Sequence, residues 1–349
     1  METKILKMDT AADEKLSVAA QAIKNGDLVA FPTETVYGLG ANGLDEKAAA
    51  KIYAAKGRPS DNPLILHIDS IKMLAMITDK VPHMAMEIMA AFCPGPITMI
   101  VPKKIAVPDR ITGGLSTVGV RMPDNDIARK LITLSGVPIA APSANLSGRP
   151  SPTTAATVYD DLNGRIPYIL DGGPSDFGVE STIVDCTESI PVILRPGAIT
   201  KEMLEEIFPE VRVDPALSGK NSVPKAPGMK YRHYAPKAPM ILLKGRKENM
   251  LAAFTKELSK CKKAGQSVGI IASHEVTNLL RHSYSYDYGS QNDLFHIAAD
   301  LYNALRYFDD KPVDILLAEG TTEKGIGLAI MNRLKKASGQ NILSAYKNN

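Results

Sequence analysis

Hydroxyl- and glycine-rich loops recur along the first part of this sequence, each beside a short apolar run. Lys56 and Arg58 form a Lys-x-Arg pair, and Arg121 and Arg195 stand in two further loops. Glycine-rich backbone N–H groups and Ser or Thr hydroxyls suit phosphate oxygens, and a guanidinium binds anions through two parallel hydrogen bonds. These residue types predict a shared anion site, built from loops at residues 32–38, 113–121, 142–148, 171–183 and 192–197.

Several common catalytic motifs are absent from the sequence. It has no G-x-x-x-x-G-K-[ST] phosphate loop, no H-E-x-x-H, no C-x-x-C and no G-x-S-x-G elbow. Few carboxylates accompany the cations, and Glu34 and Glu180 are those that stand directly among the hydroxyl residues of these loops. Cations and hydroxyls without an obvious nucleophile favour phosphoryl or nucleotidyl transfer that works by positioning its substrates.

A dinucleotide-binding fingerprint also occurs, because Gly38, Gly40 and Gly43 match G-x-G-x-x-G. That motif directly follows a strand in proteins that use it, whereas here residues 32–37 separate it from the apolar run 28–31. The glycines are therefore predicted to serve a tight loop.

The elements that position these loops alternate between strands and helices. The apolar runs 28–31, 64–68 and 138–141 are typical of buried strands. Asp45 caps a predicted helix from Glu46 to Lys56, and Gly57 ends it, so that Lys56 and Arg58 are expected to project from its last turn. This alternation predicts an α/β fold.

Length and composition favour a globular protein with two domains. The chain has 349 residues, 44% apolar and 23% charged, and a net charge of +3, which is too small to indicate nucleic-acid binding by itself. Its three cysteines lack metal-site spacing, and no apolar run approaches a membrane span or a signal peptide. We therefore expect a cytoplasmic protein with reduced thiols and no membrane partner.

The organisation changes after Pro196-Gly197. We expect a catalytic domain over residues 1–210, a linker over 211–239 and a smaller α/β domain over 240–349, with a parallel sheet. Two tyrosines, a histidine and several cations crowd residues 227–236 between prolines, which favours a lid over the first domain. The glycine-rich stretch 320–327 is a candidate loop at a strand end, but no neighbouring cation cluster assigns it chemistry.

Four segments carry a family resemblance: residues 32–39 (PTETVYGL), 56–59 (KGRP), 143–145 (SAN) and 227–236 (PGMKYRHYAP). The first three resemble the YrdC-like domain of L-threonylcarbamoyladenylate synthases, and the fourth looks like the longer, two-domain form. The resemblance covers essentially the whole chain. It implies a YrdC-like twisted-sheet α/β domain followed by a smaller Rossmann-like α/β domain.

The resemblance also implies an activity. L-Threonine, bicarbonate and ATP, with Mg²⁺, would give threonylcarbamoyl-AMP and pyrophosphate. The product would feed the tRNA threonylcarbamoyl-transfer machinery, which modifies the adenosine next to the anticodon. Such a nucleotidyltransferase need only orient two anions and neutralise phosphate charge.

Site residues follow by matching positions. Lys56 and Arg58 would be catalytic, with no metal ligands from the protein. The nucleotide would be bound by Arg58, Asn62, Thr117, Ser143, Asn145, Ser151, Arg195 and Tyr231. Threonine would be bound by Thr35, His67, Arg121, Ala141 and Ser181. A guanidinium fits a carboxylate through two hydrogen bonds, which suits Arg121 to the threonine carboxylate.

A binding protein is the alternative from a different class. YrdC-like domains resemble RNA-binding surfaces in being concave and basic, so the alternative is a double-stranded RNA or ribosome-assembly binding protein without ATP turnover. The net charge of +3 predicts weak direct tRNA binding. A carbamoyl-transfer domain of the hydrogenase-maturation type resembles the first half only.

Overall fold

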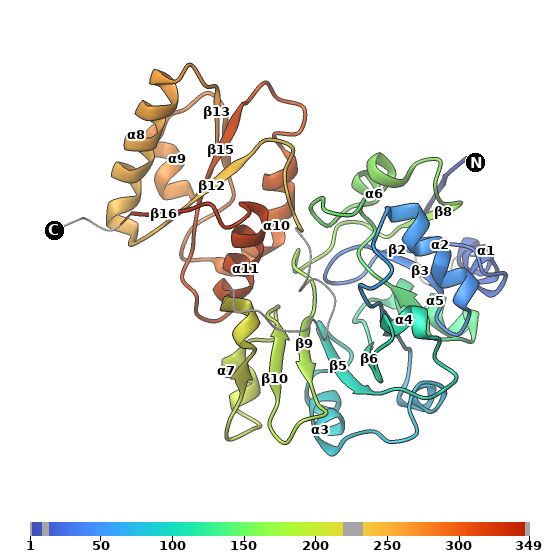
Figure 1. Ribbon diagram of the computed structural model, residues 1–349. Coiled ribbons are helices and arrows are strands. Elements are labelled where there is room, and N and C mark those ends of the chain that lie inside the picture. The colour runs from blue at the N-terminus through green and yellow to red at the C-terminus, as the bar shows by residue number, and fades with distance from the viewer. Residues whose placement is uncertain (1, 9–13, 219–232, 346–349) are drawn as a thin grey trace. The chain divides into compact units, whose positions relative to one another are not determined.

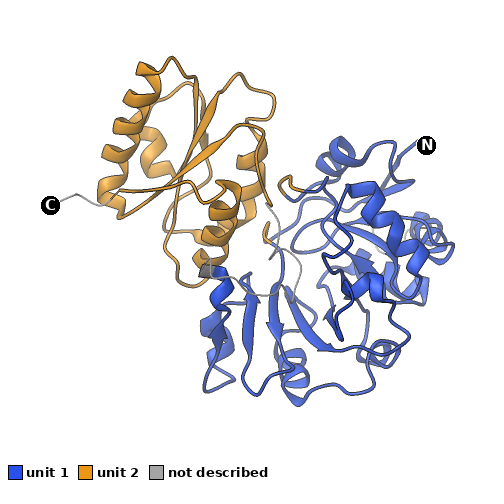
Figure 2. Ribbon diagram, in the orientation of Figure 1, with its two compact units in different colours: residues 1–147, 151–176, 180–231 blue, residues 148–150, 177–179, 232–349 orange. Residues whose placement is uncertain are grey.

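The computed structural model describes residues 2–8, 14–218 and 233–345. The chain divides into two compact units (Figure 2). Unit 1 comprises residues 1–147, 151–176 and 180–231, and unit 2 comprises residues 148–150, 177–179 and 232–349. In the described part of the chain, no helix is long and apolar enough to cross a membrane.

Unit 1 is built on one mixed sheet of 11 strands (Figure 1). In spatial order the strands are β1 (Lys4–Lys7), β8 (Tyr168–Asp171), β2 (Val29–Phe31), β3 (Gly38–Asn42), β7 (Ile139–Ala141), β4 (Ile65–His67), β6 (Thr117–Arg121), β5 (Ile97–Pro102), β9 (Thr182–Asp185), β10 (Val192–Arg195) and β11 (Arg212–Val213). Short connecting elements are η1 (Ile71–Met76), α4 (Asp109–Thr112) and η2 (Pro215–Ser218).

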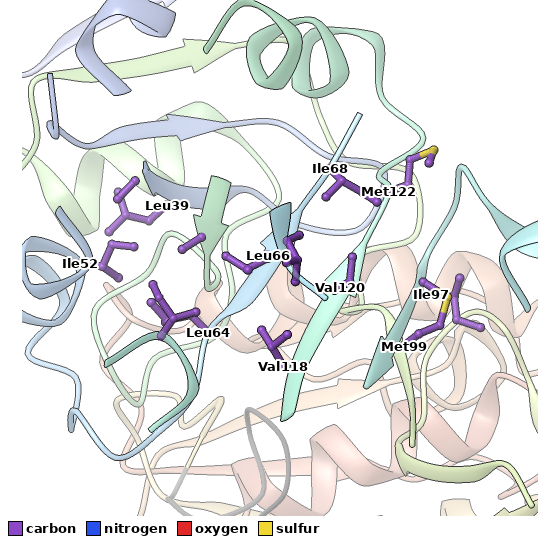
Figure 3. Packing of buried hydrophobic residues seen from close by; sticks show 14 of the residues in the cluster. Leu39, Ile52, Leu64, Leu66, Ile68, Ile97, Met99, Val118, Val120 and Met122 are labelled. Atoms are coloured by element: carbon purple, nitrogen blue, oxygen red, sulfur yellow. The ribbon is translucent and has the colours of Figure 1, made fainter. Parts of the chain in front are cut away.

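One face of this sheet carries the main hydrophobic core. Successive residues of a strand point to opposite faces, so Leu66, Val120 and Met99 share this face with their neighbours two residues away. Figure 3 shows these side chains, among them Leu66 on β4 and its register partner Val120 on β6. The helices that contribute to this core are α2 (Glu46–Lys56), α3 (His83–Phe92), α6 (Ala155–Leu162) and α7 (Lys201–Glu205).

The opposite face is covered over only part of its width. Helices α1 (Lys15–Lys24) and α5 (Asp126–Ser135) pack there against apolar residues of β2, β7 and β8. Over β4, β5, β9 and β10 the same face holds only a small apolar cluster, which includes Ile65, Ile100 and Ile183. By alternation, His67 on β4 and Thr98 on β5 lie on this second face.

Of the G-x-G-x-x-G glycines, only Gly43 lies in a turn, so the prediction of a tight loop is wrong for Gly38 and Gly40. Gly38 and Gly40 lie in strand β3, which pairs antiparallel with β2 and with β7. A Cβ on Gly40 would stand 2.8 Å from Ile139 Cγ2 and 2.9 Å from Phe31 Cε1. These glycines are needed because neighbouring side chains pack against the backbone of β3.

Helix α2 forms as the sequence predicts. The Asp45 side chain accepts hydrogen bonds from the backbone N–H groups of Lys47 and Ala48, and Gly57 ends the helix with a φ of 61°. Lys56 does not project from the last turn, however. It is only 2% exposed and turns into the protein.

Unit 2 contains a five-stranded parallel sheet, which confirms the predicted α/β domain with a parallel sheet. The strand order is β14 (Ser285–Asp287), β13 (Val268–Ala272), β15 (Ile315–Glu319), β12 (Met240–Lys244) and β16 (Ile342–Ser344). Helices α8 (Lys247–Lys263) and α9 (His274–Leu280) pack together, as do α10 (Leu294–Arg306) and α11 (Gly327–Ala337).

Two short segments from the first part of the chain belong to unit 2. Arg306 donates hydrogen bonds to the carbonyl of Pro150, and Arg149 forms an ion pair with Asp309. Gly178 has a φ of 65°, and a Cβ there would lie 2.3 Å from the carbonyl oxygen of Ala299. Residues 148–150 and 177–179 are thus fixed by helix α10 and the turn after it.

Candidate active site

The polar residues of the second face follow from strand alternation. His67 on β4 and Arg121 on β6 are register partners and are both buried. Thr98 on β5 and Ser181, which directly precedes β9, are also buried. His67, Arg121 and Thr98 are each one residue away from members of the main core, so their side chains face the other way. Ser181 is two residues from Ile183, which belongs to the small cluster on the second face.

Several of the residues expected to bind the nucleotide lie at one end of these strands, and His67 and Arg121, expected to bind threonine, lie at the other end. Strands β4 and β6 run parallel, with Ile65 opposite Gly119 and His67 opposite Arg121. Thr117 therefore lies at the far end of β6 from Arg121, about 13 Å away along an extended strand.

Strand β7 runs antiparallel to β4, with Ala141 opposite Ile65, so Ser143 continues towards the Thr117 end. Asn62 precedes β4 at that same end. The structure thus brings together three of the expected nucleotide residues (Asn62, Thr117 and Ser143), away from His67 and Arg121.

Arg121 forms a buried ion pair with Glu34. Its Nη2 atom lies 2.7 Å from Glu34 Oε1, and the two side chains are 5% and 3% exposed. Apart from this contact, Arg121 Nε and Nη2 and both Glu34 oxygens have no hydrogen-bond partner among the described residues, and all four atoms are buried. Buried polar groups are nearly always hydrogen-bonded in native proteins, so these atoms indicate a ligand that carries both an anionic and a cationic group.

His67 is neutral at this site. Burial, and next the positive charge of Arg121, lower its pKa from 6.5 to about 3. Its Nδ1 atom lies 3.3 Å from the carbonyl oxygen of Ile65, and its ring meets Phe31 edge to face. A neutral imidazole can accept or donate a hydrogen bond, which suits a substrate hydroxyl.

Two pairs of buried hydroxyl groups belong to the segments that carry these residues. Thr33 and Thr35 flank Glu34 in the sequence, and the fully buried Thr35 hydroxyl lies 2.9 Å from that of Thr33. The Ser181 hydroxyl lies 2.8 Å from that of Thr98.

Arg195 donates from Nε and Nη2 to the carbonyl of Ser181, at 3.1 and 3.0 Å, and from Nη2 to its hydroxyl at 3.1 Å. Arg195 was expected to bind the nucleotide and Ser181 to bind threonine, so the two expected sets adjoin here.

The loop after β7 is held by Lys56. Its ammonium donates to the carbonyls of Ser143 and Asn145, each at 2.5 Å. The Ser143 hydroxyl in turn donates to Asn145 Oδ1 at 2.5 Å. Lys56 therefore links the Lys-x-Arg and Ser-x-Asn motifs and acts on the loop that carries Ser143.

Arg58 and Asn62 are neighbours in the segment between helix α2 and strand β4. Arg58 is half-buried and donates to the carbonyls of Asn62 and Pro63 at 3.3 and 3.0 Å. The side-chain nitrogen of Asn62 is buried and finds no hydrogen-bond partner among the described residues. Ser151, a further expected nucleotide residue, donates to Glu180 at 2.5 Å. Tyr231 lies outside the described residues, as does most of the predicted lid.

Two family models cover most of the chain. A model described as "Telomere recombination", for Sua5, YciO and YrdC proteins, matches residues 21–197. A second, described as "Threonylcarbamoyl-AMP synthase, C-terminal domain", matches residues 199–339. The chain belongs to the Sua5/YciO/YrdC family.

Relatives in this family are similar over almost their full length. A threonylcarbamoyl-AMP synthase of Pyrococcus abyssi is 50% identical, and the match covers 94% of this chain and 95% of the relative. The Bacillus subtilis enzyme of that name is 48% identical, with 95% of each covered. The crystal structure of P. abyssi Sua5 complexed with L-threonine superposes with a TM-score of 0.92 at 48% identity, over 98% of this chain and 99% of that one.

Two site residues of this Sua5-family chain escape the sequence analysis. Glu34 was noted as a carboxylate in a polar loop but was not paired with Arg121, which lies 87 positions further along the chain. Thr98 was not noted at all. The alternation of Ile97, Thr98 and Met99 is the signal that could have placed its hydroxyl opposite the core.

Proposed function

We propose that this chain is an L-threonylcarbamoyladenylate synthase. It would convert L-threonine, bicarbonate and ATP into threonylcarbamoyl-AMP, pyrophosphate and water. The single observation that carries the proposal is the buried Arg121–Glu34 pair, whose free hydrogen-bonding atoms match the two charges of an amino-acid zwitterion. The names of the relatives and the threonine complex of the P. abyssi protein support the same reaction.

Each charged group at the site has a role in threonine binding. Arg121 would bind the carboxylate through two hydrogen bonds. Glu34 would accept a hydrogen bond from the α-amine of threonine. Once the amine has lost a proton, this hydrogen bond would orient the lone pair of the threonine nitrogen. The hydroxyls of Thr35 and Ser181, with neutral His67, would bind the substrate hydroxyl, and Ala141 would lie beside its methyl group.

The chemistry then needs positioning and charge neutralisation. The threonine nitrogen attacks the carbon of bicarbonate, water leaves, and a carbamate forms. A carbamate oxygen attacks the α-phosphorus of ATP, and the bond to the β-phosphate oxygen breaks to release pyrophosphate. Arg195, next to Ser181, and Arg58, near the Thr117 end, would stabilise the developing phosphate charge. Lys56 would act as a positioning residue for the Ser143 to Asn145 loop.

Mg²⁺ would enter with ATP. The described residues contain no group of three or more His, Cys, Asp or Glu side chains that could hold a metal ion. Mg²⁺ often keeps several waters and is bound through substrate phosphates with one or two carboxylates, so this residue set fits a metal that ATP carries. When bound, it would neutralise charge on the departing pyrophosphate.

The product is a mixed anhydride, and its use would be the threonylcarbamoyl modification of the adenosine next to the tRNA anticodon by a separate transfer machinery. Cys93, Cys186 and Cys261 are free thiols, as expected in the cytoplasm. We place the enzyme in that compartment.

Pyrophosphate release by the purified protein tests this proposal. Release is expected only when ATP, L-threonine and bicarbonate are all present, and threonylcarbamoyl-AMP is expected by mass spectrometry. Release that continues without threonine, or RNA binding without any ATP turnover, would overturn the proposal and favour the RNA-binding alternative.

A further inference from the structure

A cavity lies at the carboxyl ends of strands β12 and β15 in unit 2. Its volume is about 500 Å³, within the range of about 300–1,000 Å³ that is usual for small-molecule sites. It is lined by Lys244 to Lys247 and Met250 on one side, and by Gln291 and Glu319 to Glu323 on the other.

The topology of the sheet places this cavity at a switch point. From β12 the chain moves along the sheet to β13 and then β14, whereas from β14 it returns past β13 to β15 and then crosses to β16. Right-handed crossovers in opposite directions put their helices on opposite faces, so the loops after neighbouring β12 and β15 diverge. Open parallel sheets bind ligands in the crevice that such diverging loops leave.

The fold brings a cation cluster to the glycine-rich loop at residues 320–327. Lys244, Arg246 and Lys247 line the cavity, and they exceed in number the two carboxylates there, Glu319 and Glu323. Glu323 is held by Lys244 and, at 3.0 Å, by Lys335 outside the cavity lining. The cavity wall therefore carries an excess of positive charge.

Helix α8 begins at this cavity. Its N-cap residue is Arg246, which makes no side-chain capping hydrogen bond. The first N–H groups of a helix have no intrahelical acceptors, and together with the helix dipole they favour anions. Arg246 lies 4.0 Å from the Glu248 carboxylate, and Lys247 donates to the Asn292 side chain at 3.0 Å. A phosphate group at this position would satisfy the backbone groups and add a second anionic partner for the two exposed cations.

The cavity also has groups that suit the uncharged part of a ligand. Glu319 is 2% exposed, and burial raises the pKa of its carboxyl. One of its oxygens accepts a hydrogen bond from the backbone N–H of Ser273 at 2.6 Å. The side chains of Gln291 and Thr322 add donors and acceptors, and Met250 adds an apolar surface.

We propose that unit 2 carries a second ligand site, for a phosphate-bearing small molecule of about mononucleotide size. Its phosphate lies at Arg246, Lys247 and the start of α8, and its uncharged part lies towards Gln291 and Glu319. The site is separate from the threonine and ATP residues of unit 1, and it does not depend on the function proposed above.

Two variants disable this site in different ways. Arg246→Glu with Lys247→Glu reverses the charge without touching the Lys244–Glu323 ion pair. Thr322→Trp, at an exposed position in the cavity lining, fills the space and leaves the charges in place. Lys263→Glu, at the opposite end of α8, is the matched control for a charge change in the same unit.

Equilibrium dialysis of the full-length protein with AMP, ATP and pyrophosphate tests the proposal. At least one probe is expected to bind at a site whose dissociation constant rises about tenfold or more in both site variants and is unchanged in the control. The charge-reversal variant loses a charge-assisted contact, and Thr322→Trp loses the space for the probe. Threonine-dependent pyrophosphate release by unit 1 is read in parallel. If no probe shows such a class, or if Lys263→Glu weakens it equally, the proposal is wrong.

Discussion

Glu34 and Arg121 are two buried opposite charges in direct contact, and Arg121 Nε and Glu34 Oε2 have no hydrogen-bond partner among the described residues. Removing one partner of such a pair leaves the other charge buried and uncompensated. Under the proposed function, a threonine zwitterion would add one charge of each sign, so it would complete the hydrogen bonding of the pair without changing the net charge of the site. Substrate binding and the stability of this region would then be linked at these two residues.

Glu34→Gln keeps the shape of the side chain and removes its charge. We expect kcat/KM for threonine to fall by about tenfold to a hundredfold, the usual effect of losing a charged hydrogen bond, while KM for ATP changes little. Steady-state pyrophosphate release at varied threonine and ATP measures both. Glu46→Gln, whose carboxylate pairs with Arg110 at the surface, is the control. Equal kinetics for Glu34→Gln and wild type would contradict this role.

Lys56 and Arg58 are two positions apart and differ in their surroundings. The sequence predicts that both project from the last turn of α2, but Lys56 is buried and donates hydrogen bonds to two loop carbonyls. Lys56→Ala should lower the free energy of unfolding by about 2–4 kcal/mol, because it leaves buried carbonyls unpaired. Arg58→Ala should cost less stability yet reduce turnover about a hundredfold, through lost phosphate contacts. Urea unfolding and pyrophosphate release on both variants separate the two effects; identical stability losses would contradict the distinction.

His67 makes stability depend on pH. Its folded pKa of about 3 lies below its unfolded value of 6.5, so the unfolded chain binds the proton more readily. The contribution of His67 is fully present above pH 6.5 and is lost as the pH falls towards 3, by about 1.4 kcal/mol per unit at most. Urea midpoints at pH 7.5 and 5 should therefore differ more in wild type than in His67→Gln. The same pH dependence in both proteins would show that another group is responsible.

At the scale of elements, β3 depends on the absence of side chains. Gly40→Ala would bring a methyl group to within 2.8 Å of Ile139 and 2.9 Å of Phe31, both fully buried. Overpacking of this kind typically costs about 1–3 kcal/mol. The comparison is Gly119→Ala on β6, where the nearest atom is 3.2 Å away and the cost should be smaller. Thermal unfolding of the two variants shows which one loses more stability. A larger loss in Gly119→Ala than in Gly40→Ala would contradict this prediction.

Local elements were predictable where periodicity and caps agree. Helix α2 with its Asp45 cap, and the α/β character of unit 2 with its parallel sheet, follow from such signals. Strand β3 did not, because three glycines in six residues resemble a turn, and only the packing of Ile139 and Phe31 against the strand explains Gly38 and Gly40. Sheet order was beyond the sequence too, since it depends on pairings between distant segments. For that reason Arg246 and Lys247 could not be connected with the loop at 320–327.

The candidate site also divides into features that motifs predict and contacts that only the fold decides. Lys-x-Arg, Ser-x-Asn and the hydroxyl loops predict an anion site, and the structure links the first two motifs through Lys56. Which cation contacts which group was set by the fold: Lys56 holds a loop, and Arg121 meets Glu34. Pairs of this kind join residues whose sequence separation carries no periodic signal.

At the scale of the whole molecule, unit 1 has hydrophobic cores on both faces of its sheet. A chain of residues 1–210 should therefore fold, but residues 148–150 and 177–179 would lack the α10 region that fixes them. Hydrogen exchange should be faster at these two segments than in the full-length protein, with β4 and β6 equally protected in both. Unchanged exchange at 148–150 and 177–179 would show that unit 1 alone fixes them.

Because residues 148–150 and 177–179 belong to unit 2, the order of synthesis affects when they reach their final contacts. Synthesis proceeds from the N-terminus, and a domain generally folds once its residues have left the ribosome. Residues 148–150 and 177–179 emerge more than a hundred positions before Arg306 and Asp309, which hold the first of them. During that interval the segments beside Ser151 and Glu180 lack their contacts with the α10 region. The newborn first unit therefore completes the backbone around Ser151 and Glu180 only after the α10 region has been synthesised.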